Sequence, residues 1–295
     1  MDYKRLMNDF SIPPIGLGTF PLRGEQMNLA VASALSCGYR LFDTAYGYEN
    51  DDSLGIALSE ALPAIGMTRK DIFLTSKIGD KLLNGAPTGS FFYDSPSCLN
   101  RNVEDVVKMQ MESTLNHLKT DYVDILLIHY PYPTHKRIWK VFEKFYQEGM
   151  VKVIGVSNYR KRHLMDLMED CSISPMVNQY EHHPLNTKKE VLEYCKLNHI
   201  VVEASSPLLL MQQPITESPV LKSLSLKYGK SISQIILRWN IQLGIIPIPK
   251  SGNPKRIKEN LSVFDFALTD DEIKSIDGMN ENYINLPESL YCPGY

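Results

Sequence analysis

The sequence predicts a closed (β/α)8 barrel of the TIM type, an α/β fold, as a single domain spanning residues 1–295. Eight short runs rich in β-branched residues or leucine alternate with longer segments of helical period, which is typical of repeated βαβ units. Most of these runs are continuously apolar, as expected for parallel strands that are buried on both faces. No Ser/Gly linker or shift in composition divides the chain into two domains.

The expected strands and helices follow one another in a regular order. The expected strands are residues 14–20, 40–45, 72–77, 122–129, 153–158, 176–181, 200–206 and 245–251. The helical segments between and after them are residues 25–38, 51–62, 103–118, 136–149, 161–170, 188–198, 220–229, 233–244, 254–260 and 268–279. Gly38 and Gly149 stand where a glycine commonly ends a helix in the left-handed conformation.

An open, doubly wound sheet is the alternative architecture. Its fingerprint would be a glycine-rich turn that opens a helix, and the nearest candidate is GLGTFP at residues 16–21. The sixth position of this segment is Pro21 instead of glycine, so we favour the barrel. The polar opening MDYKRLMNDFSIPP, which ends in paired prolines, predicts a short hairpin-like flap ahead of the first barrel strand.

Charge and cysteine content exclude several classes of partner. Lysine and arginine number 31 against 34 acidic residues, a formal charge of -3, and no basic block indicates binding to nucleic acid or to an anionic membrane. The N-terminus lacks the apolar segment of a signal peptide, and no apolar run approaches the roughly 18 residues of a membrane span. The five cysteines are odd in number and widely spaced, so we expect reduced thiols in a cytoplasmic protein.

Polar side chains stand at the carboxyl ends of most predicted strands, where this fold builds its active sites. They are Asp43, Lys77, His129, Ser157, Asn158, Gln179, Ser205, Ser206, Lys250 and Ser251. Each has an ordinary alternative explanation, such as a turn cap for Asp43 or a hydrogen-bonded core histidine for His129. Those separate explanations do not account for the convergence of all ten residues on one rim. This convergence predicts a catalytic site at that rim.

The segments around these residues resemble the sequence motifs of the aldo-keto reductase superfamily. FDTAYGYEN around Asp43 and Tyr48, TSKIG around Lys77 and LLIHYP around His129 are similar to the motifs of its catalytic tetrad. Similar to its cofactor-binding motifs are GVSN at 155–158, VNQYEHHP at 177–184, SPL at 206–208 and IPKSGNPKRIKEN at 248–260. The motifs occur in the superfamily's order over nearly the whole chain.

The chemistry of carbonyl reduction gives an independent reason for these residue types. Hydride addition develops negative charge on the carbonyl oxygen, so a proton donor must stand beside it. A free tyrosine has a pKa of about 10, and we expect the ammonium of Lys77 to lower that pKa by favouring the phenolate. An ion pair with Asp43 would hold Lys77 in place, while His129 would orient the carbonyl oxygen or assist proton transfer. Tyr46 competes with Tyr48 as proton donor, but only Tyr48 has the spacing from Asp43 found in the superfamily.

The end of the last strand predicts the cofactor. Lys250 and Ser251 end this strand, and Asn253 and Arg256 belong to the start of a helix whose free N–H groups favour an anion. Residues 248–258 include no carboxylate that would bind a ribose diol, so we expect NADPH in preference to NADH, as the resemblance also implies. A capped helix with solvated charges is the alternative explanation of this segment.

The resemblance also implies which residues contact the cofactor and the substrate. It places Ser157, Asn158 and Gln179 at the nicotinamide carboxamide, and Glu259 and Asn260 near the adenine. The full set of expected cofactor residues is Thr19, Phe20, Ser157, Asn158, Gln179, Ser205, Ser206, Leu208, Lys250, Ser251, Arg256, Glu259 and Asn260. The expected substrate-binding residues are Phe20, Tyr48 and His129.

The sequence departs from the superfamily's pattern in two places. Ser205 stands where relatives usually carry an aromatic residue that stacks on the nicotinamide, so we expect weaker cofactor binding or a different aromatic side chain in that place. Residues 79–102 form a long segment without a clear helical pattern. Its Phe91, Phe92 and Tyr93 are candidates for a wall of the substrate pocket. A surface loop without contact to the substrate is an equal alternative for this segment.

These observations together predict a cytoplasmic, NADPH-dependent reductase of aldehydes or ketones that acts as a monomer on a small carbonyl substrate. An NADP(H)-binding sensor or docking scaffold with little turnover is one alternative. A metal-dependent barrel hydrolase is another, but it requires several histidine and carboxylate ligands at the strand ends, where His129 is the one histidine. The neighbouring His182 and His183 lack a partner at ligand spacing and match a structural turn of the superfamily, so we expect no metal site.

Overall fold

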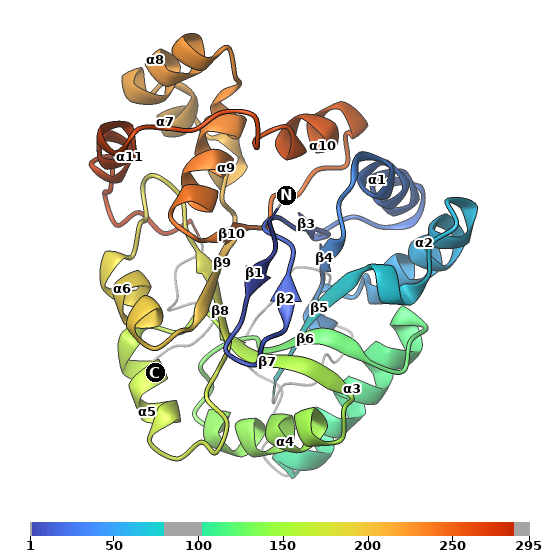
Figure 1. The fold of residues 1–295 in the computed structure, drawn as a ribbon. Helices are drawn as coiled ribbons and strands as arrows, with labels where there is room; N and C mark the ends of the chain where they lie inside the picture. Colours follow the sequence, from blue (N-terminus) through green and yellow to red (C-terminus); the bar gives the residue numbers. More distant parts are fainter. Residues whose placement is uncertain (1, 80–101, 286–295) are drawn as a thin grey trace.

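Eight parallel strands form the centre of the molecule and curl into a barrel, which confirms the predicted fold class (Figure 1). The computed structural model describes residues 2–79 and 102–285. Each strand pairs with its neighbours in sequence, and the eight are β3 (Leu17–Gly18), β4 (Leu41–Asp43), β5 (Phe73–Ile78), β6 (Val123–Ile128), β7 (Val151–Ser157), β8 (Val177–Glu181), β9 (Val201–Ser205) and β10 (Ile246–Pro247).

Hydrogen bonds between the first and last barrel strands close the sheet. Gly18 and Lys250 form a parallel bridge. The backbone amides of Gly16 and Gly18 also donate to the carbonyl oxygens of Pro247 and Pro249, both at 3.1 Å. An open sheet would leave these two edges apart, so the doubly wound alternative is wrong.

The first and last barrel strands are shorter than the sequence predicts. β3 covers two residues of the predicted strand 14–20, and β10 covers two of the predicted strand 245–251. Pro14, Pro247 and Pro249 have no N–H group to donate to a sheet ladder, which limits regular pairing in both segments.

The helices lie close to their predicted positions, with differences of a few residues at some ends. They are α1 (Gly24–Cys37), α2 (Asp51–Ala64), α3 (Val103–Leu118), α4 (His135–Gln147), α5 (Lys161–Met168), α6 (Lys189–Leu197), α7 (Gln213–Thr216), α8 (Pro219–Tyr228), α9 (Ile232–Gln242), α10 (Pro254–Leu261) and α11 (Asp270–Asp277). Gly38 and Gly149 have φ of 109° and 77° just beyond α1 and α4, as expected for glycines that end helices. The sequence pattern did not predict α7 or the short 3-10 turns η1 (Tyr46–Tyr48), η2 (Arg69–Asp71) and η4 (Leu209–Met211).

The strands are buried on both faces of the sheet, which explains their continuously apolar sequence. All six residues of β6 are buried. The charged member of this strand, Asp124, is paired with Arg69 at 2.7 Å. A second apolar cluster surrounds Trp239 of α9, whose indole N–H donates to Asp277 of α11. Burial of this kind stabilises the fold by roughly 25 cal/mol for each Å² of apolar surface.

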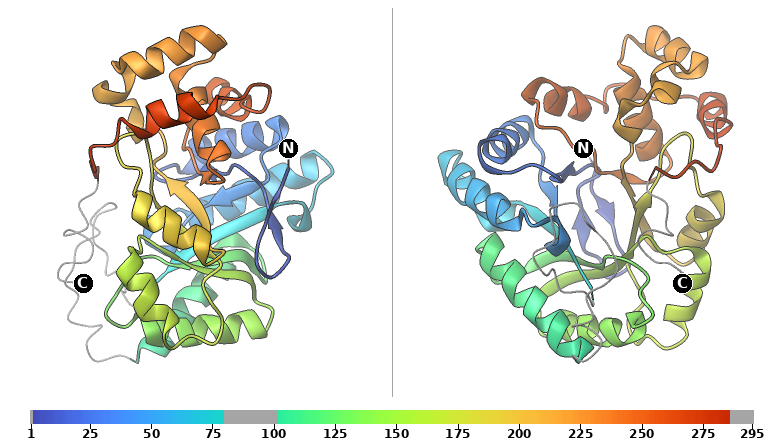
Figure 2. Two further views of the ribbon diagram at one scale, coloured as in Figure 1. Left: turned by 60° about the vertical axis from the view of Figure 1, so that its left-hand side comes forward. Right: turned by 180° about the vertical axis from the view of Figure 1, so that it is seen from behind.

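An N-terminal hairpin covers one end of the barrel. Strand β1 (Lys4–Arg5) pairs antiparallel with β2 (Ser11–Ile12), as the predicted flap requires. The rings of Tyr3 and Phe10 pack edge-on against Phe73, with centroids 5.8 and 5.7 Å apart. Phe73 is the first residue of β5, so the hairpin lies at the amino ends of the strands (Figure 2). The carboxyl ends form the opposite rim, where the polar residues were expected.

Gly55 allows α2 and α3 to approach each other closely. A Cβ atom at this position would overlap the carbonyl oxygen of His117 and lie 2.9 Å from Cα of Leu118. We therefore expect Gly55→Ala to lower the free energy of unfolding in a urea titration by about 2 kcal/mol, a typical cost of overpacking. Gly278→Ala is the matched control, because its Cβ would meet no atom closer than 3.4 Å. Equal destabilisation by the two variants would contradict the close helix contact.

Candidate active site

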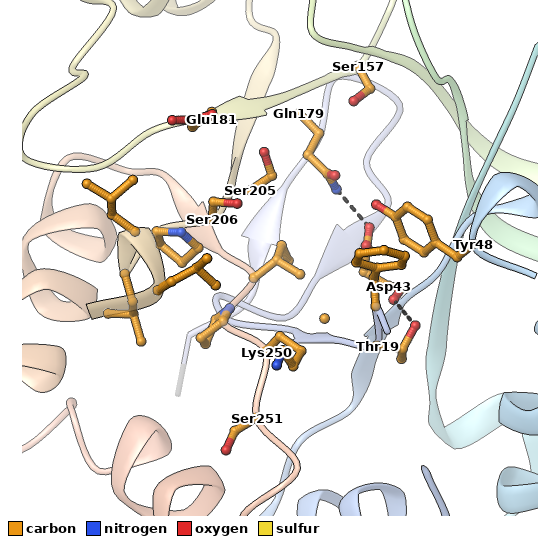
Figure 3. A pocket seen from close by; sticks show the side chains of 18 of the residues that line it. Thr19, Asp43, Tyr48, Ser157, Gln179, Glu181, Ser205, Ser206, Lys250 and Ser251 are labelled. Atoms are coloured by element: carbon orange, nitrogen blue, oxygen red, sulfur yellow. Dashed lines mark hydrogen bonds between the residues drawn. The ribbon is translucent and has the colours of Figure 1, made fainter. Parts of the chain in front are cut away.

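The polar residues from the strand ends gather around one cavity of about 660 Å³ (Figure 3). Sixteen of the seventeen residues expected to form the site line this cavity, namely Thr19, Phe20, Asp43, Tyr48, His129, Ser157, Asn158, Gln179, Ser205, Ser206, Leu208, Lys250, Ser251, Arg256, Glu259 and Asn260. The exception is Lys77, which is only 1% exposed and lies beneath Tyr48 and Asp43. The structure thus brings the whole expected set to one rim of the barrel.

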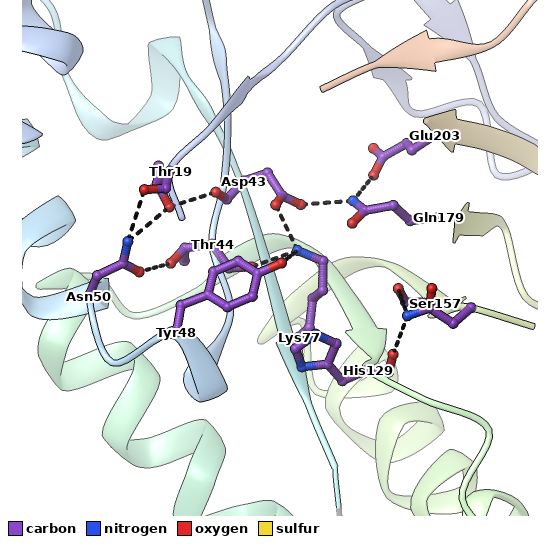
Figure 4. A network of polar contacts seen from close by, with 11 residues as sticks. Thr19, Asp43, Thr44, Tyr48, Asn50, Lys77, His129, Ser157, Gln179 and Glu203 are labelled. Atoms are coloured by element: carbon purple, nitrogen blue, oxygen red, sulfur yellow. Dashed lines mark hydrogen bonds and ion pairs between the residues drawn. The ribbon is translucent and has the colours of Figure 1, made fainter. Parts of the chain in front are cut away.

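Lys77 connects Asp43 to Tyr48. Its Nζ lies 2.7 Å from Oδ1 of Asp43 and 3.2 Å from the hydroxyl of Tyr48, and it donates to the carbonyl oxygen of Thr44 at 3.1 Å (Figure 4). Strand register explains the first contact, since Asp43 pairs with Thr75 and Lys77 follows two residues later on the same face. The ammonium therefore has three acceptors within hydrogen-bond distance.

The turn η1 carries Tyr48 into the cavity. Arg23 holds this turn by donating to the carbonyl oxygens of Tyr48 and Glu49. Tyr46, the competing candidate for proton donor, is half-buried and packs against the apolar core. Of the two tyrosines, Tyr48 is the one that lines the cavity and contacts Lys77.

Burial and charge act in opposite directions on the pKa of Tyr48. Burial raises this pKa, the Lys77 ammonium lowers it and Asp43 raises it, and the net pKa lies above the ordinary value of 10.0. The expectation of a lowered pKa is therefore wrong in its net direction, although Lys77 acts as expected. Burial lowers the pKa of Lys77, but Asp43 and Tyr48 raise it to a net value above the ordinary one. The pair is thus a neutral phenol beside a charged ammonium.

His129 follows the end of β6 and faces Tyr48. The two rings meet edge to face with centroids 5.7 Å apart, and the imidazole stacks on Tyr130 at 4.6 Å. Burial, together with the charge of Lys77, holds the pKa of His129 well below its ordinary value. The imidazole is therefore neutral, and it can donate one hydrogen bond and accept another.

Asn158 joins the ends of β6, β7 and β8. Its Nδ2 donates to the carbonyl oxygen of His129 at 3.1 Å, and its backbone N–H donates to the carbonyl oxygen of Gln179 at 2.7 Å. Asn158 has φ of 65°, a left-handed conformation that asparagine tolerates better than most residues. This arrangement fixes Ser157 and Asn158 at the rim of the cavity.

Glu203 is a residue of the site that the sequence prediction missed. It is fully buried in β9, and its Oε2 accepts a hydrogen bond from Nε2 of Gln179 at 2.8 Å. The same Nε2 donates to Oδ2 of Asp43, also at 2.8 Å. Burial raises the pKa of Glu203 to about 7, and the charge of Asp43 adds to this effect. A glutamate within the apolar run IVVEASS is the signal that would have pointed to it.

Asn50 is a second polar residue that the sequence prediction missed, and its hydrogen bonds support the backbone around Asp43. Asn50 is fully buried, accepts a hydrogen bond from Thr44 Oγ1 at 2.9 Å and donates to the carbonyl oxygen of Thr19 at 3.1 Å. Thr19 in turn donates through Oγ1 to the carbonyl oxygen of Asp43 at 2.8 Å. These bonds satisfy the buried polar groups between β3 and β4, which fixes the backbone on both sides of Asp43.

The far end of the cavity has the features of an anion site. Asn253 caps α10 by accepting from the backbone N–H groups of Lys255 and Arg256, at 2.9 and 3.3 Å, and Pro254 is the first helical residue. Lys250 and Arg256 line the cavity beside this helix end. The expectation of free N–H groups at this helix start is wrong, because Pro254 has none and Asn253 accepts from those of Lys255 and Arg256. The charges of Lys250 and Arg256, together with the helix dipole, still favour a phosphate group here.

The aromatic lining of the cavity comes from one side of the barrel. Phe20, Tyr48 and Tyr130 line it there, whereas Ser205 and Ser206 line it at the end of β9. The expected effect of Ser205 on cofactor binding stays a prediction. Phe91, Phe92 and Tyr93, the candidates for a pocket wall, lie outside the described residues.

The two neighbouring histidines have partners of their own. His182 stacks on Trp239 at 4.9 Å and contacts Oδ1 of Asn240 at 2.9 Å. His183 contacts Oε1 of Glu181 at 2.8 Å. Within residues 2–79 and 102–285, no three histidine, cysteine or acidic side chains are grouped as a metal site would require.

In the same part of the chain, no helix is long and apolar enough to cross a bilayer.

Comparison with known proteins supports the motif resemblance. A family model described as "Aldo/keto reductase family" matches residues 14–281. The chain is 42% identical over 279 residues to the uncharacterized oxidoreductase YtbE of Bacillus subtilis (strain 168), covering 94% of this chain and 92% of that protein. It is 37% identical over 283 residues to glyoxal reductase of the same organism, covering 95% and 94%. The structure of Bombyx mori aldo-keto reductase in complex with NADP matches with a TM-score of 0.85 at 29% identity, covering 98% of each chain.

The raised pKa of Glu203 makes stability depend on pH. This pKa is about 7 in the folded protein against the ordinary 4.5, so the folded state holds more protons than the unfolded state between these values. The free energy of unfolding therefore falls as pH rises through this window. Glu203→Gln has no such proton to lose, so its stability relative to the wild type should rise by up to about 3 kcal/mol between about pH 5 and about pH 8. Urea titrations at the two pH values measure this change, and a constant difference would contradict the raised pKa.

Proposed function

The chain belongs to the aldo/keto reductase family, and we propose that it reduces an aldehyde or ketone to the alcohol with NADPH, using Tyr48 as proton donor. The observation that carries this proposal is the contact of Tyr48 with the buried pair of Lys77 and Asp43, beside His129, at one end of the cavity. The other end of the same cavity carries the anion site of Lys250 and Arg256.

The residues around the cavity fit NADPH. The capped N-terminus of α10, with Lys250, Ser251 and Arg256, suits a phosphate monoester, and residues 248–258 include no carboxylate that would repel it. Glu259 and Asn260, further along α10, would lie near the adenine. At the other end, Ser157, Asn158 and Gln179 would hydrogen-bond the carboxamide. The nicotinamide, when bound, supplies the hydride.

Tyr48 and Lys77 carry out the proton transfer. Tyr48 would donate its proton to the carbonyl oxygen, where negative charge develops during reduction, so no free alkoxide would have to form. The net rise of the Tyr48 pKa keeps the phenol protonated, which is the state that reduction requires. Lys77 stabilises the phenolate that remains, because its ammonium already lies 3.2 Å from the oxygen.

His129 positions the carbonyl. A neutral imidazole is a weak acid but a good hydrogen-bond donor, so the low pKa of His129 favours orientation of the carbonyl oxygen over proton transfer. Phe20 packs 5.0 Å from the ring of Tyr48 and adds an apolar wall beside the reacting group. An NADP(H) sensor without turnover, the alternative drawn from the sequence, would need none of these contacts at Tyr48.

Removing the Tyr48 hydroxyl tests the proposed proton donor. We expect Tyr48→Phe to lower the rate of carbonyl reduction by about 10²- to 10⁴-fold, the usual range for a lost general acid, while the Kd of NADPH changes by less than about 3-fold. The assay follows NADPH absorbance with a panel of small aldehydes and ketones that includes glyoxal. Tyr46→Phe is the matched control and should retain turnover. A Tyr48→Phe variant as active as the wild type would place proton donation on another group.

The anion site is tested by comparing the two nicotinamide cofactors. We expect Lys250→Met and Arg256→Gln each to raise the Kd of NADPH by about 10- to 100-fold, because each removes a charge-assisted hydrogen bond to phosphate. The Kd of NADH should change far less, since NADH lacks the phosphate ester. Lys255→Gln removes a charge from the same helix outside the cavity lining and serves as the control. Equal losses for NADPH and NADH would contradict the assignment of the phosphate site.

A further inference from the structure

The side-chain amide of Gln179 has its orientation fixed by two carboxyl groups. Nε2 donates one hydrogen to Oδ2 of Asp43 and the other to Oε2 of Glu203, both at 2.8 Å (Figure 4). The reversed amide would bring its oxygen against the carboxylate of Asp43 and lose both N–H donations. Within the described residues nothing donates to Oε1 of Gln179, and this side chain lines the cavity. Oε1 is therefore the atom that Gln179 offers to a ligand.

Glu203 is placed for this task by strand register. Gln179 of β8 and Glu203 of β9 are direct partners in the parallel ladder, so their side chains project to the same face of the sheet. On the other side, Glu203 pairs with Ile246 of β10, which has no titratable group. The charged groups that act on Glu203 are Asp43 and Lys77 across the barrel interior.

Burying a carboxyl group at this position carries a cost that an apolar residue would avoid. Glu203 is 0% exposed, and its Oε1 has no hydrogen-bond partner within the described residues. Only Oε2 makes a hydrogen bond, and that bond goes to Gln179. An unsatisfied buried oxygen costs about 1–3 kcal/mol, so a carboxyl group here is unfavourable for stability. Within the described residues, the side chain of Glu203 makes one hydrogen bond, and its partner is Gln179.

We propose that Glu203 is a positioning residue that holds the Gln179 amide with Oε1 toward the nicotinamide carboxamide. Oε1 then accepts from the carboxamide N–H, and this contact sets the place of the ring relative to Tyr48. Glu203 touches neither cofactor nor substrate, and acts through Gln179. The inference rests on the proposed function, because it assumes a nicotinamide cofactor at this end of the cavity.

Two substitutions separate orientation of the amide from simple packing. Glu203→Met keeps the length of the side chain but removes the acceptor, so the Gln179 amide loses one of the two partners that fix it. Glu203→Gln keeps an oxygen that accepts from Nε2 of Gln179. We expect Glu203→Met to raise the Kd of NADPH by about 10-fold, and Glu203→Gln to change it by less than about 3-fold. A purely structural role gives no reason for the conservative variant to restore binding.

A double-mutant cycle with Gln179→Met tests the route of the effect. If Glu203 acts through Gln179, the double variant binds NADPH about as weakly as Gln179→Met alone. If the two act independently, the double variant loses about 10-fold more affinity than Gln179→Met alone, because the two losses multiply. Multiplied losses, or a Glu203→Gln variant as weak as Glu203→Met, would overturn the proposal.

The measurement is titration of each purified full-length variant with NADPH, followed by quenching of protein fluorescence, with thermal unfolding as a check of folding. Turnover of the wild type with the carbonyl panel is measured in parallel. Absence of wild-type turnover would contradict the proposed reductase function, whereas the cycle in Kd reports on Glu203 alone. The two proposals can therefore fail separately.

Discussion

The buried ammonium of Lys77 is the constraint on which the site depends. A charge with 1% exposure is costly unless it is paired and hydrogen-bonded. Asp43, Thr44 and Tyr48 supply three acceptors for its three N–H groups. Because every donor is used, Lys77 cannot move without leaving a buried N–H unpaired. The position of the Tyr48 hydroxyl relative to the charge is thus set by the same contacts that make burial of the amine possible.

Asp43 extends this constraint across the barrel. One carboxylate oxygen accepts from Lys77 on the neighbouring strand, and the other accepts from Gln179 on the far side of the interior. The two halves of the site therefore share one carboxylate. Closure of the sheet between β3 and β10 keeps those strands at fixed separation, so the closed barrel is what allows β4, β5, β8 and β9 to meet at one group.

The sequence predicts the parts of the site that depend on the ends of single strands. Asp43, Lys77 and His129 could be placed on one rim because parallel strands in a closed barrel present their carboxyl ends together. Glu203 and the net direction of the Tyr48 pKa could not be predicted, because each depends on packing between strands that are distant in sequence. The sequence also predicts a longer first and last barrel strand than the structure has. An apolar run predicts a buried strand, but the ladder also requires N–H groups, which the prolines of those segments lack.

The two ends of the cavity differ in charge. This difference affects how a nicotinamide cofactor could bind without an aromatic residue at position 205, where this chain has Ser205. At the Tyr48 end, Lys77 is balanced by Asp43 and His129 is neutral, whereas Lys250 and Arg256 make the α10 end cationic. Stacking of an aromatic ring on a nicotinamide contributes about 0.5–1.5 kcal/mol. A hydrogen bond between charged groups contributes about 1.5–3 kcal/mol. In the proposed complex, phosphate contacts from Lys250 and Arg256 would outweigh the stacking that Ser205 cannot provide. The orientation of the ring would then depend more on the polar side chains proposed to bind its carboxamide.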